Sequence, residues 1–188
     1  MPRAGLDSEA VVSAAASLVD AEGLEALTLA RLAAMLGVRS PSLYAHVGGL
    51  EDVRRRLATR GARELAARLQ SAAAGRARGD ALAAVADAYV GYAREHPGLY
   101  AALQRPPAAS DDPGAAAAEQ LLAAVAAVLR GYGLEDEDAV HATRILRSAL
   151  HGFVSLEASG GFELPLALDE TFSRLVALLD SGLSAVEG

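Results

Sequence analysis

Apolar residues spaced by three and four positions recur along most of this chain. In the stretch 29–36, Leu29, Leu32 and Leu36 stand at i, i+3 and i+7, which is the stripe with which an amphipathic helix buries one face. No stretch alternates apolar and polar residues in the manner of a half-buried strand. The pattern therefore predicts an all-α protein of about nine helices, over residues 8–22, 29–36, 41–47, 50–74, 80–95, 99–104, 115–130, 136–158 and 169–184.

Glycine and proline separate the predicted helices. Asp7 is expected to cap the first helix, and Gly37 to end the second with a positive φ, which a residue without Cβ adopts easily. Ser40 is predicted as the N-cap of the next helix, with Pro41 as its first residue. The stretch 106–114 is expected to be a loop.

The second and third predicted helices together describe a helix-turn-helix. The third, 41–47, is too short to be stable alone, so its Leu43 and Val47 are expected to pack on the second helix. The other side chains of this segment then face solvent and are mostly polar: Arg39, Ser40, Ser42, Tyr44, Ala45 and His46. Two short helices, a glycine turn and a polar outer face are typical of a DNA-reading unit. An ordinary αα-hairpin in a helical bundle has the same spacing.

This segment resembles the N-terminal domain of the TetR family of bacterial transcriptional repressors. The matching residues are Glu22-Gly23, Leu27-Thr28, Leu32-Ala33, Leu36-Gly37-Val38, Ser42-Leu43-Tyr44 and His46-Val47. A weaker similarity, to the Trp-His-Gly type of TetR C-terminal domain, rests on Leu150-His151-Gly152-Phe153, Phe162, Phe172 and Gly182-Leu183. In that motif Leu150 stands where Trp is common.

The resemblance implies a helix-turn-helix DNA-binding domain at 1–49 and a regulatory and dimerisation domain at 50–188. It further implies a ligand-responsive transcriptional regulator, in most cases a repressor, that binds palindromic operator DNA as a homodimer and is released by a small-molecule effector. The alternative is a helical ligand-binding or adaptor protein that keeps the fold without specific DNA binding.

Groove geometry assigns roles to the exposed residues of the predicted reading helix. A helix in the major groove places its N-terminal residues against base edges, while flanking groups contact phosphates. The Arg39 guanidinium can bond guanine in two places, and Thr28 offers a hydroxyl and amide groups to a phosphate. The resemblance adds Tyr44 and His46 at the DNA surface, although a core-boundary role for Tyr44 and a capping or packing role for His46 are alternatives. The predicted DNA contacts are Thr28, Arg39, Ser40, Pro41, Ser42, Tyr44 and His46.

The start of the fourth helix departs from the family pattern. Many relatives have a Lys there as a phosphate clamp, whereas this chain has Gly48-Gly49-Leu50-Glu51. Arg54 or Arg55 is the nearest substitute, and most arginines of this helix are expected to be solvated. We therefore expect weaker or differently routed phosphate anchoring than in the family.

Aromatic and basic residues in the second half of the chain are candidates for a ligand pocket. Tyr89, Tyr92 and His96 lie at i, i+3 and i+7, and ligand sites commonly combine apolar walls with a few polar tips. Aromatic core packing explains these residues equally well, and arginines of the 136–158 helix reach solvent more often than a ligand carboxylate. The candidate pocket comprises Tyr89, Tyr92, His96, Tyr100, Leu103, Arg144, Arg147 and His151.

The resemblance to the TetR family implies that the last two predicted helices of each subunit form the dimer interface, as a four-helix bundle. One has a continuous apolar stripe, and the other a line of small residues at which two helix backbones can approach closely. A glycine inside a helix costs about 1 kcal/mol relative to alanine, so Gly152 is expected to permit a close contact, either with a partner subunit or within its own. The candidate interface comprises Ser148, Gly152, Ser155, Phe172, Leu175, Val176 and Leu179.

Composition is compatible with a DNA-binding regulator. Residues 1–63 carry eight Arg and seven acidic residues, whereas residues 64–188 carry nine Arg and seventeen acidic residues, so the acidic excess lies outside the predicted reading unit. The chain has no Cys, no signal-peptide core and no apolar run of bilayer length, so we expect a cytoplasmic protein with no membrane partner. No nucleophile–base pair, phosphate loop or metal-ligand spacing is visible. We therefore expect no enzymatic activity, no metal and no cofactor.

Overall fold

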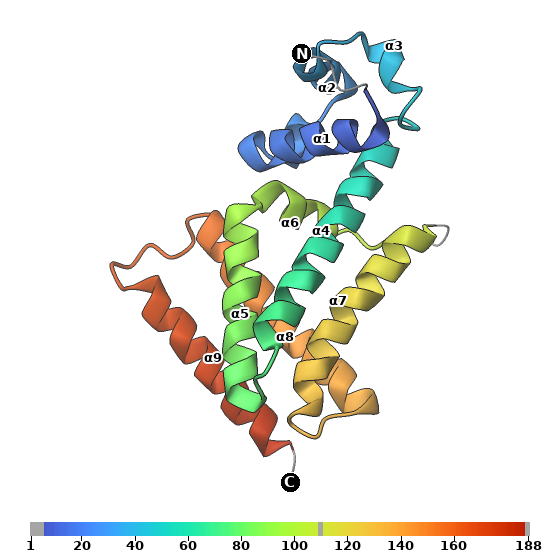
Figure 1. Ribbon diagram of the computed structural model, residues 1–188. Helices are drawn as coiled ribbons and strands as arrows, with labels where there is room; N and C mark the ends of the chain where they lie inside the picture. Colours follow the sequence, from blue (N-terminus) through green and yellow to red (C-terminus); the bar gives the residue numbers. More distant parts are fainter. Residues whose placement is uncertain (1–5, 109–110, 187–188) are drawn as a thin grey trace. The chain divides into compact units, whose positions relative to one another are not determined.

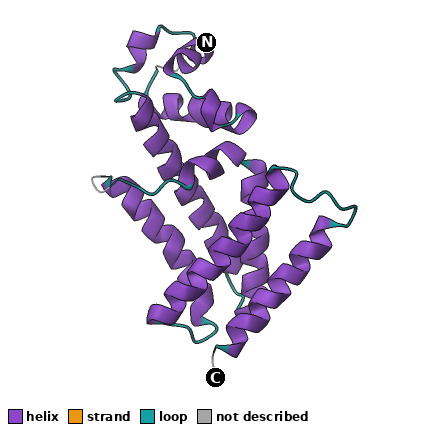
Figure 2. Cartoon of the chain, turned by 180° about the vertical axis from the view of Figure 1, so that it is seen from behind, coloured by secondary structure: helices purple, strands orange, loops and turns teal. Residues whose placement is uncertain are grey.

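The computed structural model describes residues 6–108 and 111–186, and every regular element in these residues is helical (Figures 1 and 2). This confirms the predicted fold class. The α-helices are α1 Ser8–Glu22, α2 Leu29–Leu36, α3 Ser40–Leu43, α4 Leu50–Ala73, α5 Arg78–Glu95, α6 Pro97–Leu103, α7 Asp112–Arg130, α8 Asp136–Ala158 and α9 Leu168–Ala185. A turn of 3-10 helix, Leu24–Ala26, which the sequence pattern does not predict, joins α1 to α2.

The chain divides into two compact units. The first comprises the described residues of Met1–Glu64 and Glu95–Ala118, and the second those of Leu65–Arg94 and Glu119–Gly188. Helices α4 and α7 each belong partly to one unit and partly to the other. The first unit therefore extends beyond residue 49 and includes the first part of α4 and all of α6.

Apolar faces of α1, α2, α4 and α6 make the core of the first unit. Helix α1 begins at Asp7, whose carboxylate accepts the Ala10 amide at 2.8 Å, as a helix N-cap should. Its Val11 and Val19 are completely buried. Burial of such side chains is the main favourable contribution to folding, and it fixes α1 as the platform for the short helices that follow.

Aromatic and polar contacts join the helices of the second unit. The Phe153 ring lies 5.3 Å from that of Phe162 and 5.1 Å from that of Phe172, so one aromatic cluster holds α8 to α9. The buried Tyr132 hydroxyl donates to the Asp180 carboxylate at 2.5 Å. Its burial, together with that bond, raises the pKa of Tyr132 far above the ordinary value, so the phenol stays protonated.

Helix α3 differs from its prediction at both ends. Arg39, not Ser40, is the N-cap, and Ser40 is the first helical residue, so the prediction of Ser40 as a cap is wrong. Pro41 then stands second in the helix, where its missing amide hydrogen is tolerated because the first amides of a helix have no partner within it. Regular helix ends at Leu43, and turns continue to Val47, with the His46 amide donating to the Leu43 carbonyl at 2.9 Å.

The loop before α7 is also shorter than the stretch 106–114. Helix α7 already begins at Asp112, and the Asp111 carboxylate accepts the Gly114 amide at 3.2 Å in its first turn. Proline and glycine at these positions are compatible with a first helical turn, whose amides are not yet needed for helix bonds. The sequence pattern therefore placed the helix start too late.

Helix α7 also contradicts the expectation that no apolar run reaches bilayer length. By length and composition alone it is long and apolar enough to cross a membrane. Core helices of globular proteins meet the same criterion, and Ala124, Val128 and Leu129 of this helix are buried. Alanine, which is small and only mildly apolar, is the commonest residue of this helix.

Candidate nucleic-acid interface

The turn between α2 and α3 is closed by a glycine in the left-handed conformation. Gly37 has φ 66° and ψ 30°, and the Val38 amide donates back to the Ala33 carbonyl at 3.0 Å. This is the helix ending expected for glycine, because a side chain would be strained at this φ. The turn thus sets the direction in which α3 leaves α2.

Alternate sides of the α3 segment face the core and the solvent. Leu43 is completely buried and Val47 nearly so, while Tyr44 between them is 63% exposed. The neighbouring Arg39, Pro41 and Ser42 are also exposed, and Ser40 and His46 are half-buried. The side chains of residues 39–42, 44 and 46 are therefore wholly or partly exposed, while Leu43 and Val47 anchor the segment in the core. Tyr44 does not belong to the core edge.

Two contacts fix the start of α2 next to this surface. Thr28 is the N-cap, and its Oγ1 accepts the Arg31 amide at 3.2 Å. The Arg31 guanidinium in turn donates to both carboxylate oxygens of Glu22 at the end of α1, at 2.5 and 2.6 Å. The Glu22 of the family-like motif thereby holds α2 against α1. Because it accepts this bond, the Thr28 hydroxyl retains its own hydrogen as a donor.

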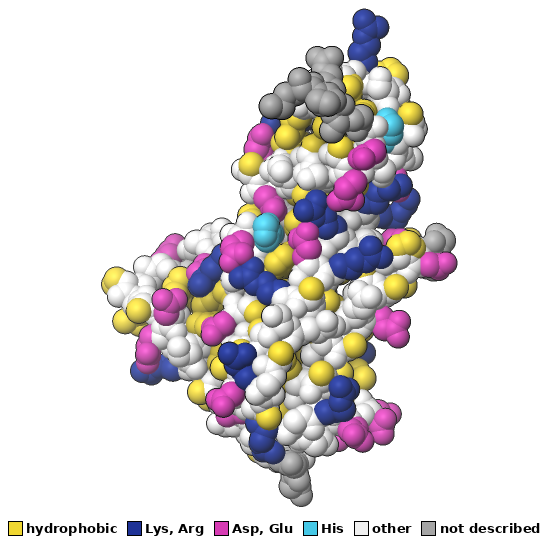
Figure 3. Space-filling view, in the orientation of Figure 1, with side chains coloured by type: hydrophobic (Ala, Val, Ile, Leu, Met, Phe, Trp, Pro, Cys, Tyr) yellow, Lys and Arg dark blue, Asp and Glu magenta, His cyan; other side chains and the backbone are white. Residues whose placement is uncertain are grey.

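Acidic residues engage the basic residues at the start of α4. The Asp52 carboxylate accepts the Gly48 amide at 2.9 Å and bonds the guanidinium groups of Arg55 and Arg56 at 2.9 and 3.0 Å. Partial burial works against its ionisation, but the Gly48 amide and the Arg56 and Arg55 charges outweigh this effect, so the pKa of Asp52 is lowered. Figure 3 shows basic and acidic side chains side by side on this part of the surface.

Arg54, one of the two candidate substitutes for the missing Lys, is bonded to Glu51 on its own helix. Its Nε is buried and has no acceptor among the described residues. Leaving a buried donor without an acceptor is unfavourable by about 1–3 kcal/mol. The Arg54 side chain therefore has one donor, Nη1, bonded to Glu51, and a second donor, Nε, that is buried without an acceptor among the described residues.

Helix α6 is fastened to α1 by a carboxylate that the sequence analysis did not single out. Asp20, near the end of α1, accepts the Gly98 and Leu99 amides through Oδ1 at 2.9 and 3.0 Å, and its Oδ2 lies 2.9 Å from His96 Nδ1. The backbones are so close that a Cβ added to Gly98 would lie 2.2 Å from the Val19 carbonyl.

The same short helix also touches α4. A Cβ added to Gly61 of α4 would lie 2.9 Å from the Leu99 carbonyl oxygen. Helix α6 therefore packs on α1 and α4 through two glycines. The separations of these partners along the chain explain why no local pattern shows the contacts, although a glycine inside a predicted helix, such as Gly61, is a signal for a close approach.

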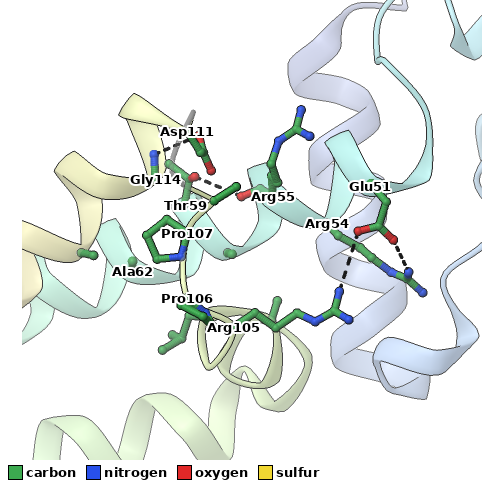
Figure 4. Close-up of a pocket in the computed structure, with 15 residues that line it drawn as sticks. Glu51, Arg54, Arg55, Thr59, Ala62, Arg105, Pro106, Pro107, Asp111 and Gly114 are labelled. Atoms are coloured by element: carbon green, nitrogen blue, oxygen red, sulfur yellow. Dashed lines mark hydrogen bonds and ion pairs between the residues drawn. The ribbon is translucent and has the colours of Figure 1, made fainter.

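The predicted pocket residues do not form one cluster within either unit. His96, Tyr100 and Leu103 belong to the first unit, with His96 held by Asp20. Tyr89 and Tyr92 are buried on α5 in the second unit, where Arg144 and Arg147 are exposed and His151 is half-buried on α8. Leu103 lines the cavity of the first unit that Figure 4 draws.

The predicted dimer residues divide into exposed and buried groups. Ser148 and Ser155 are exposed, and a Cβ added to Gly152 would meet nothing within 4 Å. Leu175, Val176 and Leu179 are half-buried. Phe172 is buried against Phe153 of the same chain.

Comparison with known proteins gives consistent results along the chain. A family model described as "Tetracyclin repressor-like, C-terminal domain" matches residues 82–179. The chain is 43% identical over 181 residues to the uncharacterized HTH-type transcriptional regulator Rv0681 of Mycobacterium tuberculosis, covering 96% of this chain and 83% of the relative. It is 38% identical over 182 residues to the uncharacterized HTH-type transcriptional regulator YobS of Bacillus subtilis, covering 97% and 95%.

A solved structure shares the fold at lower sequence identity. The Streptomyces coelicolor TetR family protein ActR, crystallised in complex with (S)-DNPA, superposes with a TM-score of 0.70 at 20% identity, covering 98% of this chain and all of that one. The identity with the two regulators extends through the helix-turn-helix, and the family model covers most of the second unit. From the reading helix to the last helix, the chain belongs to the TetR family of transcriptional regulators.

Proposed function

We propose that this TetR-type regulator is a repressor that binds a palindromic operator as a homodimer, with Arg39, Ser42 and Tyr44 of each subunit in the major groove. The observation that carries this proposal is the exposure of Tyr44 and its polar neighbours on a segment anchored by the buried Leu43 and Val47. Direct recognition of bases requires side chains that are exposed to the DNA and held in place by the protein core. Thr28 and His46 then flank it as phosphate contacts.

The exposed face of α8 and α9 supports the homodimer. Ile145 and Leu156 are 56% and 49% exposed and flank the open position at Gly152 on α8. On α9, Leu178 is 71% exposed, and Gly182 one turn later also has open space. Large exposed apolar side chains beside small residues are typical of a surface that is covered in an oligomer.

We further propose that a small-molecule effector lowers operator affinity. ActR, which shares the fold, was crystallised with the small molecule (S)-DNPA. In this chain, α6 packs on both α1 and α4, so a ligand that displaces α6 alters the support of the reading segment. The ligand shifts the DNA affinity only as far as it prefers one conformer. A regulator of this kind acts in the cytoplasm and has no enzymatic step.

Selection of genomic fragments with the purified protein, followed by fluorescence anisotropy on the enriched fragment, tests the DNA-binding proposal. We expect saturable binding that prefers a palindromic sequence and weakens steeply between low and high salt, because phosphate contacts release counterions. If only weak binding without sequence preference is found, the alternative of a helical adaptor that keeps the fold replaces the repressor.

A further inference from the structure

The first unit contains a cavity of about 460 Å³ beside the start of α4. It lies between α4, the end of α6 and residues 105–108 and 111 before α7, and Figure 4 shows side chains from each of these on its walls. The volume falls within the range of small-molecule sites. Its lining differs from the predicted pocket, of which it includes only Leu103.

Three guanidinium groups line this cavity. Arg54 and Arg55 come from α4, and Arg105 follows α6. The two lining carboxylates, Glu51 and Asp111, are both engaged. Asp111 accepts the Gly114 amide and so caps α7. Asp52, outside the lining, pairs with Arg55 at 2.9 Å, and Glu51 pairs with Arg54, so Arg105 is the lining guanidinium without a close carboxylate partner among the described residues.

Glu51 joins two of these arginines. It bonds Arg54 on its own helix, and its other oxygen lies 3.8 Å from the Arg105 guanidinium, in a contact whose side chains are both more than half exposed. Such a long, solvated ion pair contributes little, whereas a carboxylate that meets a guanidinium in a bidentate arrangement binds more strongly. The Arg54 guanidinium lines the same cavity and is bonded to Glu51, so the positive charge of Arg105 is the one that an incoming anion can meet.

Apart from Thr59, whose hydroxyl donates to the Arg55 carbonyl at 3.0 Å, the rest of the cavity lining is apolar. Its walls include Ala58, Ala62, Ala102, Leu103, Pro106 and Pro107. These side chains offer no hydrogen bonds to a ligand, but they stabilise a bound apolar group by removing it from water. A ligand that fits this lining therefore has an anionic group at one end and an apolar body.

We propose that this cavity binds a small organic anion, a carboxylate on an apolar body, whose carboxylate replaces Glu51 on Arg105. The replacement separates the start of α4 from the segment after α6. Glu51 is the second residue of α4. Gly49, with a φ of 103°, lies just before this helix, in the turn that connects it to the α3 segment. On the proposed function, on which this consequence rests, the bound anion moves α4 relative to α6 and weakens operator binding.

Isothermal titration of the full-length protein tests the binding site without DNA. The probes are octanoate, 4-phenylbutyrate and acetate, with octan-1-ol and octylamine as matched neutral and cationic compounds. We expect saturable binding of the two larger carboxylates and at least about tenfold weaker binding of acetate, the alcohol and the amine. Arg105→Gln should weaken octanoate binding by about tenfold, and Ala58→Leu, which fills the apolar wall, should also weaken it.

Arg174→Gln is the matched control, because Arg174 is an exposed, ion-paired arginine of α9. It should bind octanoate like the unmodified protein. Absence of saturable carboxylate binding, or equal binding by Arg105→Gln, overturns the site. Equal binding of acetate overturns the role of the apolar walls.

Anisotropy with operator DNA separates this inference from the proposed function. If the protein binds carboxylates but no operator, the site stands and the repressor proposal fails. If it binds an operator but no carboxylate, the repressor proposal stands and the site fails. If octanoate binds and leaves the operator affinity unchanged, the regulatory consequence is overturned.

Discussion

At the scale of single residues, Leu43 and Tyr44 are neighbours with opposite surroundings. Leu43 has no exposed surface, whereas most of the Tyr44 side chain is in solvent. A short helix obtains its stability from packing and not from its own hydrogen bonds. Leu43 can therefore serve the fold while Tyr44 is available to a partner.

Replacing Tyr44 with alanine should abolish operator recognition while preserving the fold. We expect at least about a tenfold loss of operator affinity, corresponding to about 1.4 kcal/mol, and a melting temperature close to that of the unmodified protein, because an exposed side chain contributes little packing. Anisotropy and thermal denaturation measure the two quantities. Leu43→Ala is the contrasting variant and should lose about 2–5 kcal/mol of stability. Normal operator binding by Tyr44→Ala would refute the assignment of the groove surface.

Gly98 provides a second test at this scale, because it stands where two backbones meet. The added methyl group of Gly98→Ala would overlap the Val19 carbonyl, so α6 must shift, and we expect a loss of about 1–3 kcal/mol in the free energy of unfolding. Gly48→Ala is the control, since its added methyl group would make only ordinary contacts of 3.6–3.8 Å with the Asp52 side chain, and it should lose much less stability. Chemical denaturation compares them. Equal midpoints for the two variants would contradict the packing of α6 on α1.

At the scale of elements, Asp52 organises the first turn of α4. It binds the Gly48 amide before the helix and two arginines within it. An acidic residue is favourable at this end of a helix, where amide hydrogens are unsatisfied. The lowered pKa of Asp52 shows that the fold prefers its ionised form, which makes the start of α4 sensitive to acid.

The stabilisation by ionised Asp52 should therefore be complete at neutral pH. It should disappear as the pH falls from the ordinary carboxyl pKa of 3.8 through the lower value in the folded protein, because a depressed pKa stabilises the fold only while the group is charged. The difference in melting temperature between the unmodified protein and Asp52→Asn should be large at pH 7 and shrink below pH of about 4. A difference that does not change with pH would exclude ionisation as its cause.

At the scale of the whole molecule, the α8 and α9 surface is expected to determine the oligomeric state. Gly152→Leu places a large side chain in the open position on α8. In a close helix contact between subunits, this side chain should overfill the interface, produce monomers and weaken operator binding by removing the second reading unit. Light scattering measures the mass. Ala116→Leu, at an exposed position of α7, is the control and should remain dimeric.

A folded Gly152→Leu protein that is fully dimeric would place the interface elsewhere. The internal packing of Phe172 against Phe153 would then account for the apolar stripe of α9 without a partner.

Local patterns in the sequence predict the helices and the reading segment well. The left-handed turn at Gly37 and the burial of Leu43 and Val47 follow from spacing and residue type, which act over a few positions. Asp20 could not be recognised in this way, because the Gly98 amide that it binds lies 78 residues further along the chain.

The cavity could not be predicted from the sequence for a different reason. Aromatic residues attract attention as pocket walls, yet Tyr89, Tyr92 and Tyr100 are buried. Alanine and proline leave the space that the cavity occupies, and small side chains give no positive signal of an empty volume. Most arginines of α4 were expected to be solvated, whereas Arg54 has a buried nitrogen.

The carboxylate of Asp20 has one more consequence, for hydrogen exchange. Amides in the first turn of a helix normally have no partner and exchange quickly with solvent. Those of Gly98 and Leu99 instead donate to a side chain of α1. Their protection therefore depends on the contact between two helices and not on the helix in which they lie, so these two amides report each separation of α6 from α1 even while both helices stay folded.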